Sequence, residues 1–325
     1  MCFVSEQLTP ATAMHYPWQD TQWTSLLAQV EQQRIPHALI LGGPKHTGKY
    51  QFALTLAQRM LCESPVGGYA CGSCKQCHLV TANNHPDLLK VLPEDEGKAI
   101  RIDSVRALGE FASKTSQQGG WKVVIIYPAE SMNQNSSNAL LKNLEEPGPN
   151  TLLLLVCHEP ARLSATVKSR CRIVKFPVPT ITQSRPWLSQ VVGQDQDIKQ
   201  LLDFAEGRPL LALQLIETDL LERRHAFEGM LDDLAAHRTT PLLVAEKLVV
   251  KKPVANDPVV TVDWLYSRVS SDIRSGQGAI SSRLMFRYLD RLIQAKKLLQ
   301  SSANPNVQLL WEELLLNWQL LFVTR

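Results

Sequence analysis

A glycine-rich turn between a short apolar strand and a helix is the feature that most limits how this chain can fold. Apolar residues at 38–41 lead into Gly-Gly-Pro-Lys-His-Thr-Gly-Lys at 42–49, and apolar residues at helical spacing follow. Such a loop cradles phosphate with backbone N–H groups at a helix N-terminus, and its lysine reaches the outer phosphates. The pattern predicts a phosphate-binding loop (P-loop) in an α/β domain. The candidate nucleotide-binding residues are Gly43, Thr47, Gly48 and Lys49.

Two parts of a working ATPase are missing around this loop. The position after Lys49 normally carries Ser or Thr, whose hydroxyl holds Mg²⁺, and here it is Tyr50, whose phenol cannot take that role. The strand predicted at 122–126 should end in an acidic pair, but Tyr127 and a proline follow it. Glu130 comes three residues beyond the first acidic position. We expect a helical or turn backbone there to direct its side chain away from the place that the acidic pair would occupy. The sequence predicts nucleotide binding that is weak or lost, with an active ATPase of unusual ligands as the less favoured alternative.

Strands and helices alternate through the first half of the chain. Further strands are predicted at 88–91, 123–127 and 151–156, separated by helices at 104–113 and 137–146. This alternation implies a mostly parallel sheet with helices on both faces.

A proline-marked linker at 177–180 ends this pattern, and only helical periodicity follows it. Glycine and proline residues interrupt the helices at 207–209, 239–241, 252–253 and 276–278. The sequence therefore predicts three domains, which are a degenerate P-loop domain at 1–176, a small helical lid at 177–219 and an all-α domain at 220–325.

Four of the seven cysteines lie close together, at Cys62, Cys71, Cys74 and Cys77. Two gaps of two residues suit tetrahedral coordination of Zn²⁺ by thiolates at a closed, structural site, a zinc knuckle at 62–77. In a reducing compartment such a cluster indicates a metal before a disulfide. With four sulfurs available, His78 is expected to be a bystander. Free buried cysteines are the less favoured alternative.

Composition and charge exclude several classes of protein. The 325 residues include 34 Lys+Arg and 31 Asp+Glu, and the net charge of +3 is too small to indicate nucleic-acid binding by itself. No apolar run approaches the roughly 20 residues of a membrane span. Residues 1–7 lack the basic and apolar regions of a secretory signal. We therefore expect a soluble, cytoplasmic protein without a membrane partner.

Several segments together resemble a known family. Asn-Ala-Leu-Leu-Lys-Asn-Leu-Glu-Glu-Pro at 138–147 is an amphipathic helix ended by proline, and Lys-Ser-Arg-Cys-Arg comes at 168–172. With the zinc knuckle, His-Pro-Asp at 85–87 and Asn-Pro-Asn-Val-Gln-Leu-Leu at 304–310, the chain is similar to the AAA+ subunits of the bacterial DNA polymerase III clamp loader. The resemblance implies an AAA+ P-loop domain, a helical lid and an all-α collar domain.

Within that family the motor subunits keep an intact loop and acidic pair, so the defects at Tyr50 and Tyr127 imply the non-hydrolysing stator subunit. This subunit helps to load the sliding clamp on primed DNA during replication. The resemblance implies that Arg170 acts in trans, as an arginine finger in the ATP site of the adjacent motor subunit. Ser169 would position the loop that carries it.

The resemblance also implies the partners and cofactors. The partners are the motor (gamma/tau) and wrench (delta) subunits in a heteropentamer, the sliding clamp indirectly, and primed DNA through the assembly. One implied cofactor is a structural Zn²⁺. The other is ATP, which binds at the neighbouring subunit's site and binds weakly or not at all at this subunit's own glycine loop. The apolar stripe at 309–323 suits packing between subunits and packing within the core equally well. Two alternatives stay open, an ATP-hydrolysing motor subunit or other active P-loop ATPase, and a zinc-stabilised DNA-binding module.

Overall fold

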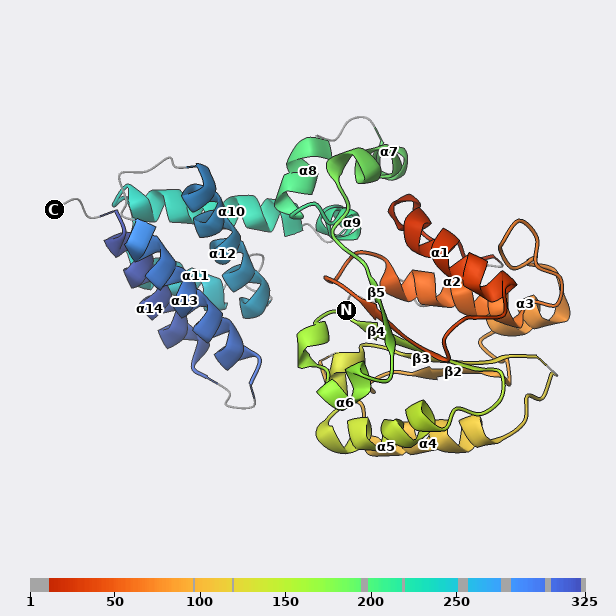
Figure 1. Ribbon diagram of the computed structural model, residues 1–325. Helices are drawn as coiled ribbons and strands as arrows, with labels where there is room; N and C mark the ends of the chain where they lie inside the picture. The colour runs from red at the N-terminus through yellow and green to blue at the C-terminus, as the bar shows by residue number, and fades with distance from the viewer. Residues whose placement is uncertain are drawn as a thin grey trace. The chain divides into compact units, whose positions relative to one another are not determined.

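The chain forms two compact units, Met1–Leu213 and Gln214–Arg325, in a computed structural model (Figure 1). Among the described helices, none combines the length and apolarity that a bilayer crossing requires. The helix breaks predicted at 252–253 and 276–278, and Asn304 of the last family segment, lie outside the described residues. The structure describes residues 12–95, 97–118, 120–193, 198–217, 220–250, 257–275, 282–301 and 305–322.

A five-stranded parallel sheet forms the centre of the first unit, with strand order β2-β3-β4-β1-β5. Strands β1, β3 and β4 are buried at every position, because they are apolar runs covered on both faces. The predicted parallel sheet is confirmed. The strands are β1 (Ala38–Gly42), β2 (Leu88–Val91), β3 (Lys122–Ile126), β4 (Thr151–Cys157) and β5 (Arg172–Lys175).

Helices cover both faces of this sheet, and each face has its own apolar core (Figure 1). On one face lie α1 (Asp20–Glu31), α2 (Lys49–Leu61) and α3 (Lys75–Thr81). On the other lie α4 (Ile102–Ser113), α5 (Gln134–Glu145) and α6 (Ala165–Lys168). Single 3₁₀ turns, η1 (Pro17–Gln19), η2 (Ala129–Ser131) and η3 (Pro160–Arg162), connect these elements. In α5 the leucines predicted to face inward do so, since Leu140 and Leu144 are buried and Leu141 packs against the same core.

The glycine loop follows β1, which lies between β4 and β5. In a parallel sheet the carboxyl ends of all strands meet at one edge, where ligands bind in folds of this kind. The residues that follow β3, β4 and β5 therefore come to the same edge as the glycine loop.

Three helices follow the sheet, α7 (Ile181–Val192), α8 (Ile198–Phe204) and α9 (Pro209–Glu217). The division between the two compact units falls within α9. The three-domain boundaries expected at residues 176 and 219 stay predictions.

The second unit is all-helical, as the periodicity predicts. Its helices are α10 (Leu220–Ala235), α11 (Pro241–Val250), α12 (Pro258–Ser275), α13 (Ser282–Leu299) and α14 (Val307–Leu320). They pack around one core, in which the Tyr288 hydroxyl donates a hydrogen bond to the carbonyl of Leu314 (3.0 Å).

The last helix resolves an alternative that the sequence leaves open. Leu314, Leu315 and Trp318 are buried in the unit's own core, and Leu310 and Leu321 pack against it. This stripe therefore serves packing within the core. Different side chains, Leu309, Leu316 and Leu320, are exposed on α14, at 61%, 48% and 63%.

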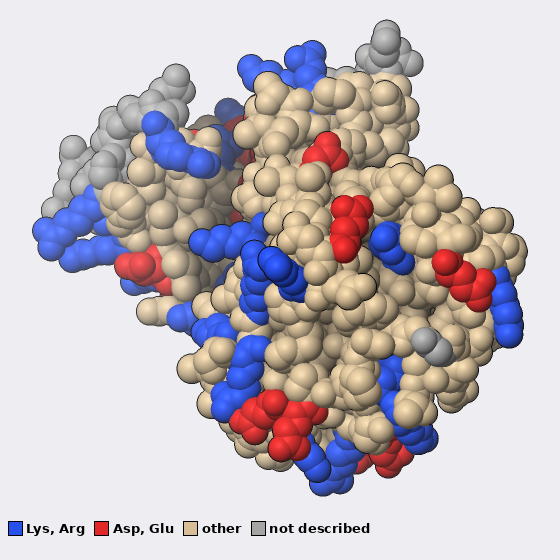
Figure 2. Space-filling model, turned by 45° about the vertical axis from the view of Figure 1, so that its right-hand side comes forward, with Lys and Arg blue, Asp and Glu red and all other residues tan. Residues whose placement is uncertain are grey.

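On the face that Figure 2 shows, charged side chains of both signs lie among uncharged ones. In the view of Figure 2, Lys and Arg side chains lie in small groups among Asp and Glu side chains, and most of the visible surface is uncharged. This distribution agrees with the small net charge of +3.

Candidate functional site

The glycine loop approaches its neighbours so closely that two of its positions require glycine. A Cβ at Gly43 would lie 1.9 Å from the carbonyl oxygen of Phe176, which follows β5. Gly48, the N-cap of α2, has φ +83°, and a Cβ there would lie 2.3 Å from the ring of Tyr16. The loop predicted from Gly43, Thr47, Gly48 and Lys49 is thus formed, but another part of the chain lies against it.

Lys49 is folded into the loop rather than extended into solvent. Its side chain is 2% exposed, and Nζ donates hydrogen bonds to the carbonyl of Pro44 and to Oγ1 of Thr47. Burial lowers the pKa of Lys49 to about 8, while the carboxylate of Glu130 acts in the opposite direction. The ammonium that would contact a phosphate is therefore bound by acceptors of the loop itself.

Glu130 is directed toward this site, and the expectation that the backbone aims it elsewhere is wrong. Its Oε1 accepts a hydrogen bond from the backbone N–H of His158, directly after β4 (2.9 Å), and its charge acts on Lys49. The reason is the 3₁₀ turn η2, which reverses the chain after β3 and which strand periodicity does not reveal. The second oxygen, Oε2, is buried without a hydrogen-bond partner in the described part of the chain.

The two aromatic residues that replace ATPase side chains contact each other. The rings of Tyr50 and Tyr127 have centroids 4.8 Å apart with an interplanar angle of 37°. Tyr127 also packs edge-on against the imidazole of His158, at 5.4 Å. Burial, with the charges of Lys49 and Lys45, lowers the pKa of His158 to about 2, so this ring is neutral. An aromatic pair thus joins the positions where an ATPase has its Mg²⁺ hydroxyl and its acidic pair.

A second aromatic group, which no motif in the sequence marks, covers the loop. The Trp18 indole N–H and the Gln19 side-chain amide both donate to the carbonyl of Thr47, at 3.0 and 2.8 Å. Tyr16 stacks on Trp18 at 4.8 Å, and Trp187 of α7 packs edge-on against both rings at 5.3 Å. The only signal in the sequence is the Tyr-Pro-Trp run at 16–18, and Trp187 is more than 150 residues away.

The charge of Arg208, in the segment between α8 and α9, acts on one side chain of the loop. His46, at φ +62°, has its pKa lowered to about 4, first by burial and then by the charge of Arg208. Arg208 itself donates to a carboxylate oxygen of Glu206 at 2.9 Å. The imidazole of His46 is therefore neutral at physiological pH.

Arg170 and Ser169 lie together at the end of α6. The Arg170 guanidinium contacts Oε1 of Glu145 through Nε (2.9 Å) and Nη2 (2.6 Å). Its Nη1 donates to the carbonyl of Thr166 (3.0 Å) and to Oγ of Ser169 (3.3 Å). The side chain is 35% exposed. The guanidinium is thus half-buried and directed by Glu145, which belongs to the Leu-Glu-Glu-Pro segment and which the sequence did not mark as a site residue.

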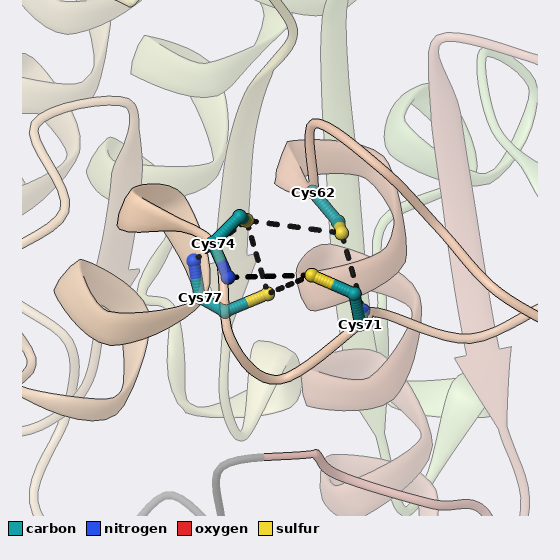
Figure 3. A group of neighbouring side chains, drawn as sticks. All are labelled: Cys62, Cys71, Cys74 and Cys77. Carbon is teal, nitrogen blue, oxygen red and sulfur yellow. Dashed lines mark hydrogen bonds between the residues drawn. The ribbon is translucent and has the colours of Figure 1, made fainter.

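The four clustered cysteines form a compact group (Figure 3). Their sulfurs all lie within 4.8 Å of one another, and three of the sulfur–sulfur distances are 3.5 Å (Cys74–Cys77), 3.9 Å (Cys71–Cys77) and 4.0 Å (Cys62–Cys74). Tetrahedral Zn–S bonds of about 2.3 Å place sulfurs about 3.8 Å apart. The group can therefore hold a metal ion with that geometry. His78 is exposed and does not belong to the group.

The hydrogen bonds around the cysteines favour a thiolate at Cys71. Backbone N–H groups of Cys71 and Cys74 donate to the sulfurs of Cys62 (3.2 Å) and Cys71 (3.3 Å). A hydrogen bond from Ser64, together with backbone N–H groups, lowers the pKa of Cys71 to about 5, whereas burial raises the pKa of Cys62 and of Cys77. The thiolate is the metal-binding form of cysteine, so Cys71 is the member of the group whose metal-binding form is favoured without an ion.

The cysteine group is attached to α1 by an aromatic contact. Tyr69, between Cys62 and Cys71, stacks on Trp23 at 5.1 Å, and its hydroxyl contacts Nδ1 of His15 at 3.1 Å. The knuckle therefore packs on the same N-terminal segment that covers the glycine loop.

Comparison with known proteins places the chain among replication proteins. A family model described as DNA polymerase III, delta subunit, matches residues 18–180, and one for its C-terminal part matches residues 260–319. DNA polymerase III subunit delta′ of Pseudomonas aeruginosa is 36% identical over 93% of this chain and 97% of its own length. DNA polymerase III subunit tau of Escherichia coli is 27% identical over 64% of this chain and 33% of its own length.

Among solved structures, a DNA polymerase III gamma subunit-related protein from Thermotoga maritima is similar to this chain. The TM-score is 0.55 and the identity 20%, and the match covers 93% of this chain and 99% of that one. At this identity the likeness concerns the fold alone, and it agrees with the AAA+ P-loop architecture.

Proposed function

The chain belongs to the delta′ subunits of the bacterial DNA polymerase III clamp loader, and from this membership we propose that it is the loader's non-hydrolysing stator. The observation that carries the proposal is the state of its nucleotide site. Tyr50 and Tyr127 are in ring contact where an ATPase holds Mg²⁺ and an acidic pair. Without these groups the metal is not held and the attacking water is not oriented, so ATP bound here would not be hydrolysed.

Hydrogen bonds within and onto the glycine loop also support the proposal that this chain binds nucleotide weakly or not at all. Lys49 is bound by Pro44 and Thr47, and the carbonyl of Thr47 is bound by Trp18 and Gln19. A nucleotide would have to displace the hydrogen bonds of Lys49 before it gained phosphate contacts.

The catalytic contribution of the subunit is made in trans by Arg170. A guanidinium stabilises the charge that develops on a transferred phosphoryl group, and such fingers contribute roughly 10³–10⁵ in rate. Ser169 donates to the carbonyl of Thr166 (3.0 Å) and contacts Arg170, which restricts the loop. Glu145 orients the guanidinium until the neighbouring subunit's γ-phosphate competes for it.

The four cysteines hold a structural Zn²⁺. The ion supplies no chemistry at a substrate, because four protein sulfurs complete a tetrahedral shell and leave no open position. Its contribution is to close the loop that carries Tyr69, and through Tyr69 to hold α1 in place.

The partners follow from the family. The subunit assembles with the motor and wrench subunits in a heteropentamer in the cytoplasm, and the assembly, rather than this chain alone, engages the sliding clamp and primed DNA. The second unit supplies the collar contacts of that assembly.

The test is ATP turnover of the isolated chain and of the reconstituted loader. The isolated chain should show no turnover, even with primed DNA and clamp. A second candidate, an active ATPase, is kept because the site retains an acidic residue, Glu130, whose charge raises the pKa of Lys49 against the effect of burial. Turnover by the isolated chain that Lys49→Ala abolishes would establish that candidate and overturn the stator proposal.

A further inference from the structure

Residues 12–19, which we call the strap, lie against the glycine loop at the N-terminus of α2. The ring of Tyr16 is so close that a Cβ at Gly48 would meet it at 2.3 Å, and the Trp18 indole N–H donates to the carbonyl of Thr47 at 3.0 Å. Backbone N–H groups at this end of a helix are the ones that contact phosphate in a P-loop. The strap therefore restricts access to the loop.

Contacts on three sides hold the strap in place. Toward α2, the backbone N–H of Ala13 donates to Oε1 of Gln58 at 2.6 Å. Toward α7, Trp187 packs edge-on against two rings of the strap, each at 5.3 Å. On the third side, the imidazole of His15 contacts Tyr69, which lies between the first two clustered cysteines. The strap is thus attached to the domain core on two sides and to the cysteine loop on the third.

His15 is engaged on both of its nitrogens and on its ring faces. Its Nε2 bonds to a carboxylate oxygen of Asp20 at 2.8 Å, and its Nδ1 contacts the Tyr69 hydroxyl at 3.1 Å. The ring stacks on Trp23 of α1 at 5.0 Å and on Tyr69 at 5.8 Å. The side chain is 5% exposed. Tyr69 therefore touches the strap through a hydrogen bond and a ring contact at the same residue.

The turn that carries Tyr69 is tight and lies directly against α1. Val66 and Tyr69 exchange two backbone hydrogen bonds of 2.9 Å around Gly67 and Gly68, which have φ +58° and +87°. Such positive φ values favour glycine. A Cβ at Gly68 would lie 2.6 Å from the side chain of Leu27 on α1. The turn thus has little room to move while it stays in place, and it presents Tyr69 to the strap in one position.

The cysteine group closes the chain segment that contains this turn. Cys62 is the C-cap of α2, and Cys71 comes two residues after Tyr69 (Figure 3). An ion held by both sulfurs joins the two ends of the segment, and closing a segment reduces the conformations open to its residues. Of the three attachments of the strap, the one through Tyr69 therefore depends on a bound ion, whereas the other two join protein groups directly.

We propose that the cysteine group is a metal-dependent latch on the strap. With the ion bound, Tyr69 holds His15 and the strap stays closed on the glycine loop. When the ion is lost, this attachment loosens, the strap opens more often and the loop admits a nucleotide. The inference rests on the proposed zinc site and on the closed glycine loop, and it adds a regulation that the stator function does not require.

The first measurement is hydrogen exchange of the Trp18 indole proton, followed by NMR in the ¹⁵N-labelled full chain. This proton is buried and bonded to Thr47, so it exchanges when the strap opens. Loss of one aromatic contact or one hydrogen bond shifts such an equilibrium roughly two- to tenfold. Tyr69→Ala loses both, so it should accelerate the exchange at least roughly tenfold. It should keep its zinc, as measured by elemental analysis, because the four cysteines remain.

Matched controls separate the latch from general damage. The backbone N–H of Leu153, in β4, donates to the carbonyl of His37 at 2.7 Å, and its exchange reports opening of the sheet and should not change. Val66→Ala truncates a side chain of the same turn that is 69% exposed, and it should exchange like the unmodified chain. Tyr69→Phe keeps the ring and loses the hydroxyl, so its acceleration should be intermediate. If Leu153 exchange rises in Tyr69→Ala, Tyr69→Phe decides the matter.

The second measurement is calorimetric titration with ADP. The apparent affinity of a ligand scales with the populated fraction of the state that admits it. Removal of zinc with a chelator and Tyr69→Ala should therefore each raise the affinity for ADP at least roughly tenfold over the zinc-loaded, unmodified chain. Because both changes act on one attachment, removal of zinc from Tyr69→Ala should raise it no further.

Unchanged Trp18 exchange or unchanged ADP affinity in the zinc-loaded Tyr69 variants would overturn the latch and leave the stator proposal intact. An equal effect of zinc removal on the unmodified chain and on Tyr69→Ala would also overturn it, because the effect would then bypass Tyr69. A full chain that holds no zinc would overturn the proposed zinc site and the latch together.

Discussion

The ring of Tyr50 lies 4.8 Å from the ring of Tyr127, and these are the two residues that occupy the Mg²⁺-hydroxyl and acidic positions of the degenerate nucleotide site. One comes from the first turn of α2 and the other follows β3, so only the folded domain brings them together. In the proposed stator, this ring contact lies where an ATPase would hold its metal ion. The site is thus rebuilt as an apolar contact, with Lys49 retained beside it as a buried cation.

The contact between Tyr50 and Tyr127 should be measurable as a coupling energy. Aromatic pairs contribute about 0.5–1.5 kcal/mol beyond the area they bury. We expect the free energies of unfolding of Tyr50→Ala, Tyr127→Ala and the double variant to be non-additive by that amount, in urea titrations. Strict additivity of the two losses would contradict the contact. Tyr266→Ala, which truncates a tyrosine on α12 of the other unit, paired with Tyr50→Ala, should give additive losses.

Replacing Arg170 should lower turnover without preventing assembly. Arg170→Ala removes a half-buried guanidinium from the segment after α6 and leaves the core unchanged, so the subunit should fold and enter the loader. ATP turnover at the motor site that it serves should fall by roughly 10³ or more. Arg172→Ala is the matched control and should leave turnover unchanged, because Arg172 lies two residues away and its guanidinium donates to Gln29 instead of Glu145. Normal turnover in the Arg170→Ala loader would remove the finger assignment.

The role of Glu145 can be separated from that of Arg170. Glu145→Gln keeps an acceptor for the guanidinium but removes the charge that holds it, whereas Glu145→Ala removes both. If Glu145 orients the finger, turnover in the loader should fall less with Gln than with Ala, and neither change should alter the affinity of the motor site for ATP. Equal turnover in both variants and the unmodified loader would show that Glu145 has no positioning role.

Metal binding should depend on the four clustered cysteines and on no other cysteine. Cys74→Ser removes a ligand whose sulfur is 3.5 Å from that of Cys77, so purified protein should lose its zinc and unfold at lower temperature. Cys171→Ser is the control and should keep one zinc per chain, as measured by elemental analysis. Zinc retained in full by Cys74→Ser would contradict a four-sulfur site.

Acid should destabilise the glycine loop through His46. Burial lowers the pKa of His46 to about 4 in the folded chain, below its ordinary value of 6.5. Between these values the unfolded chain binds a proton that the folded chain does not, so the stabilisation is complete above pH 6.5 and is lost as the pH falls to about 4. The loss is about 3 kcal/mol.

His46→Asn should flatten this dependence, because Asn tolerates the positive φ of His46 and does not titrate. Urea unfolding from pH 7 to pH 4 measures the difference between the two proteins. His237→Asn, at an exposed position, should follow the unmodified chain. Parallel curves for His46→Asn and the unmodified chain would show that His46 is not buried as described.

Periodicity predicts the central strands, and spacing predicts the cysteine group. Runs of Leu, Ile and Val predict β1, β3 and β4 because strands covered on both faces are apolar throughout, and the cysteine spacing predicts a four-sulfur group because its ligands are close in the sequence. The direction of Glu130 was predicted wrongly. It depends on the 3₁₀ turn after β3, a local conformation that leaves no periodic signal.

By itself the sequence determined the fold class, the family and the loss of two ATPase groups, since each of these depends on residue type and short-range order. Only the tertiary structure decided what replaced those groups. The pairing of Tyr50 with Tyr127, the cover of Trp18 and Trp187 over the loop, and the pairing of Arg170 with Glu145 join residues far apart in the chain. The parallel sheet and its helices bring such residues to one edge or one surface, and no pattern along the chain encodes which of them will meet.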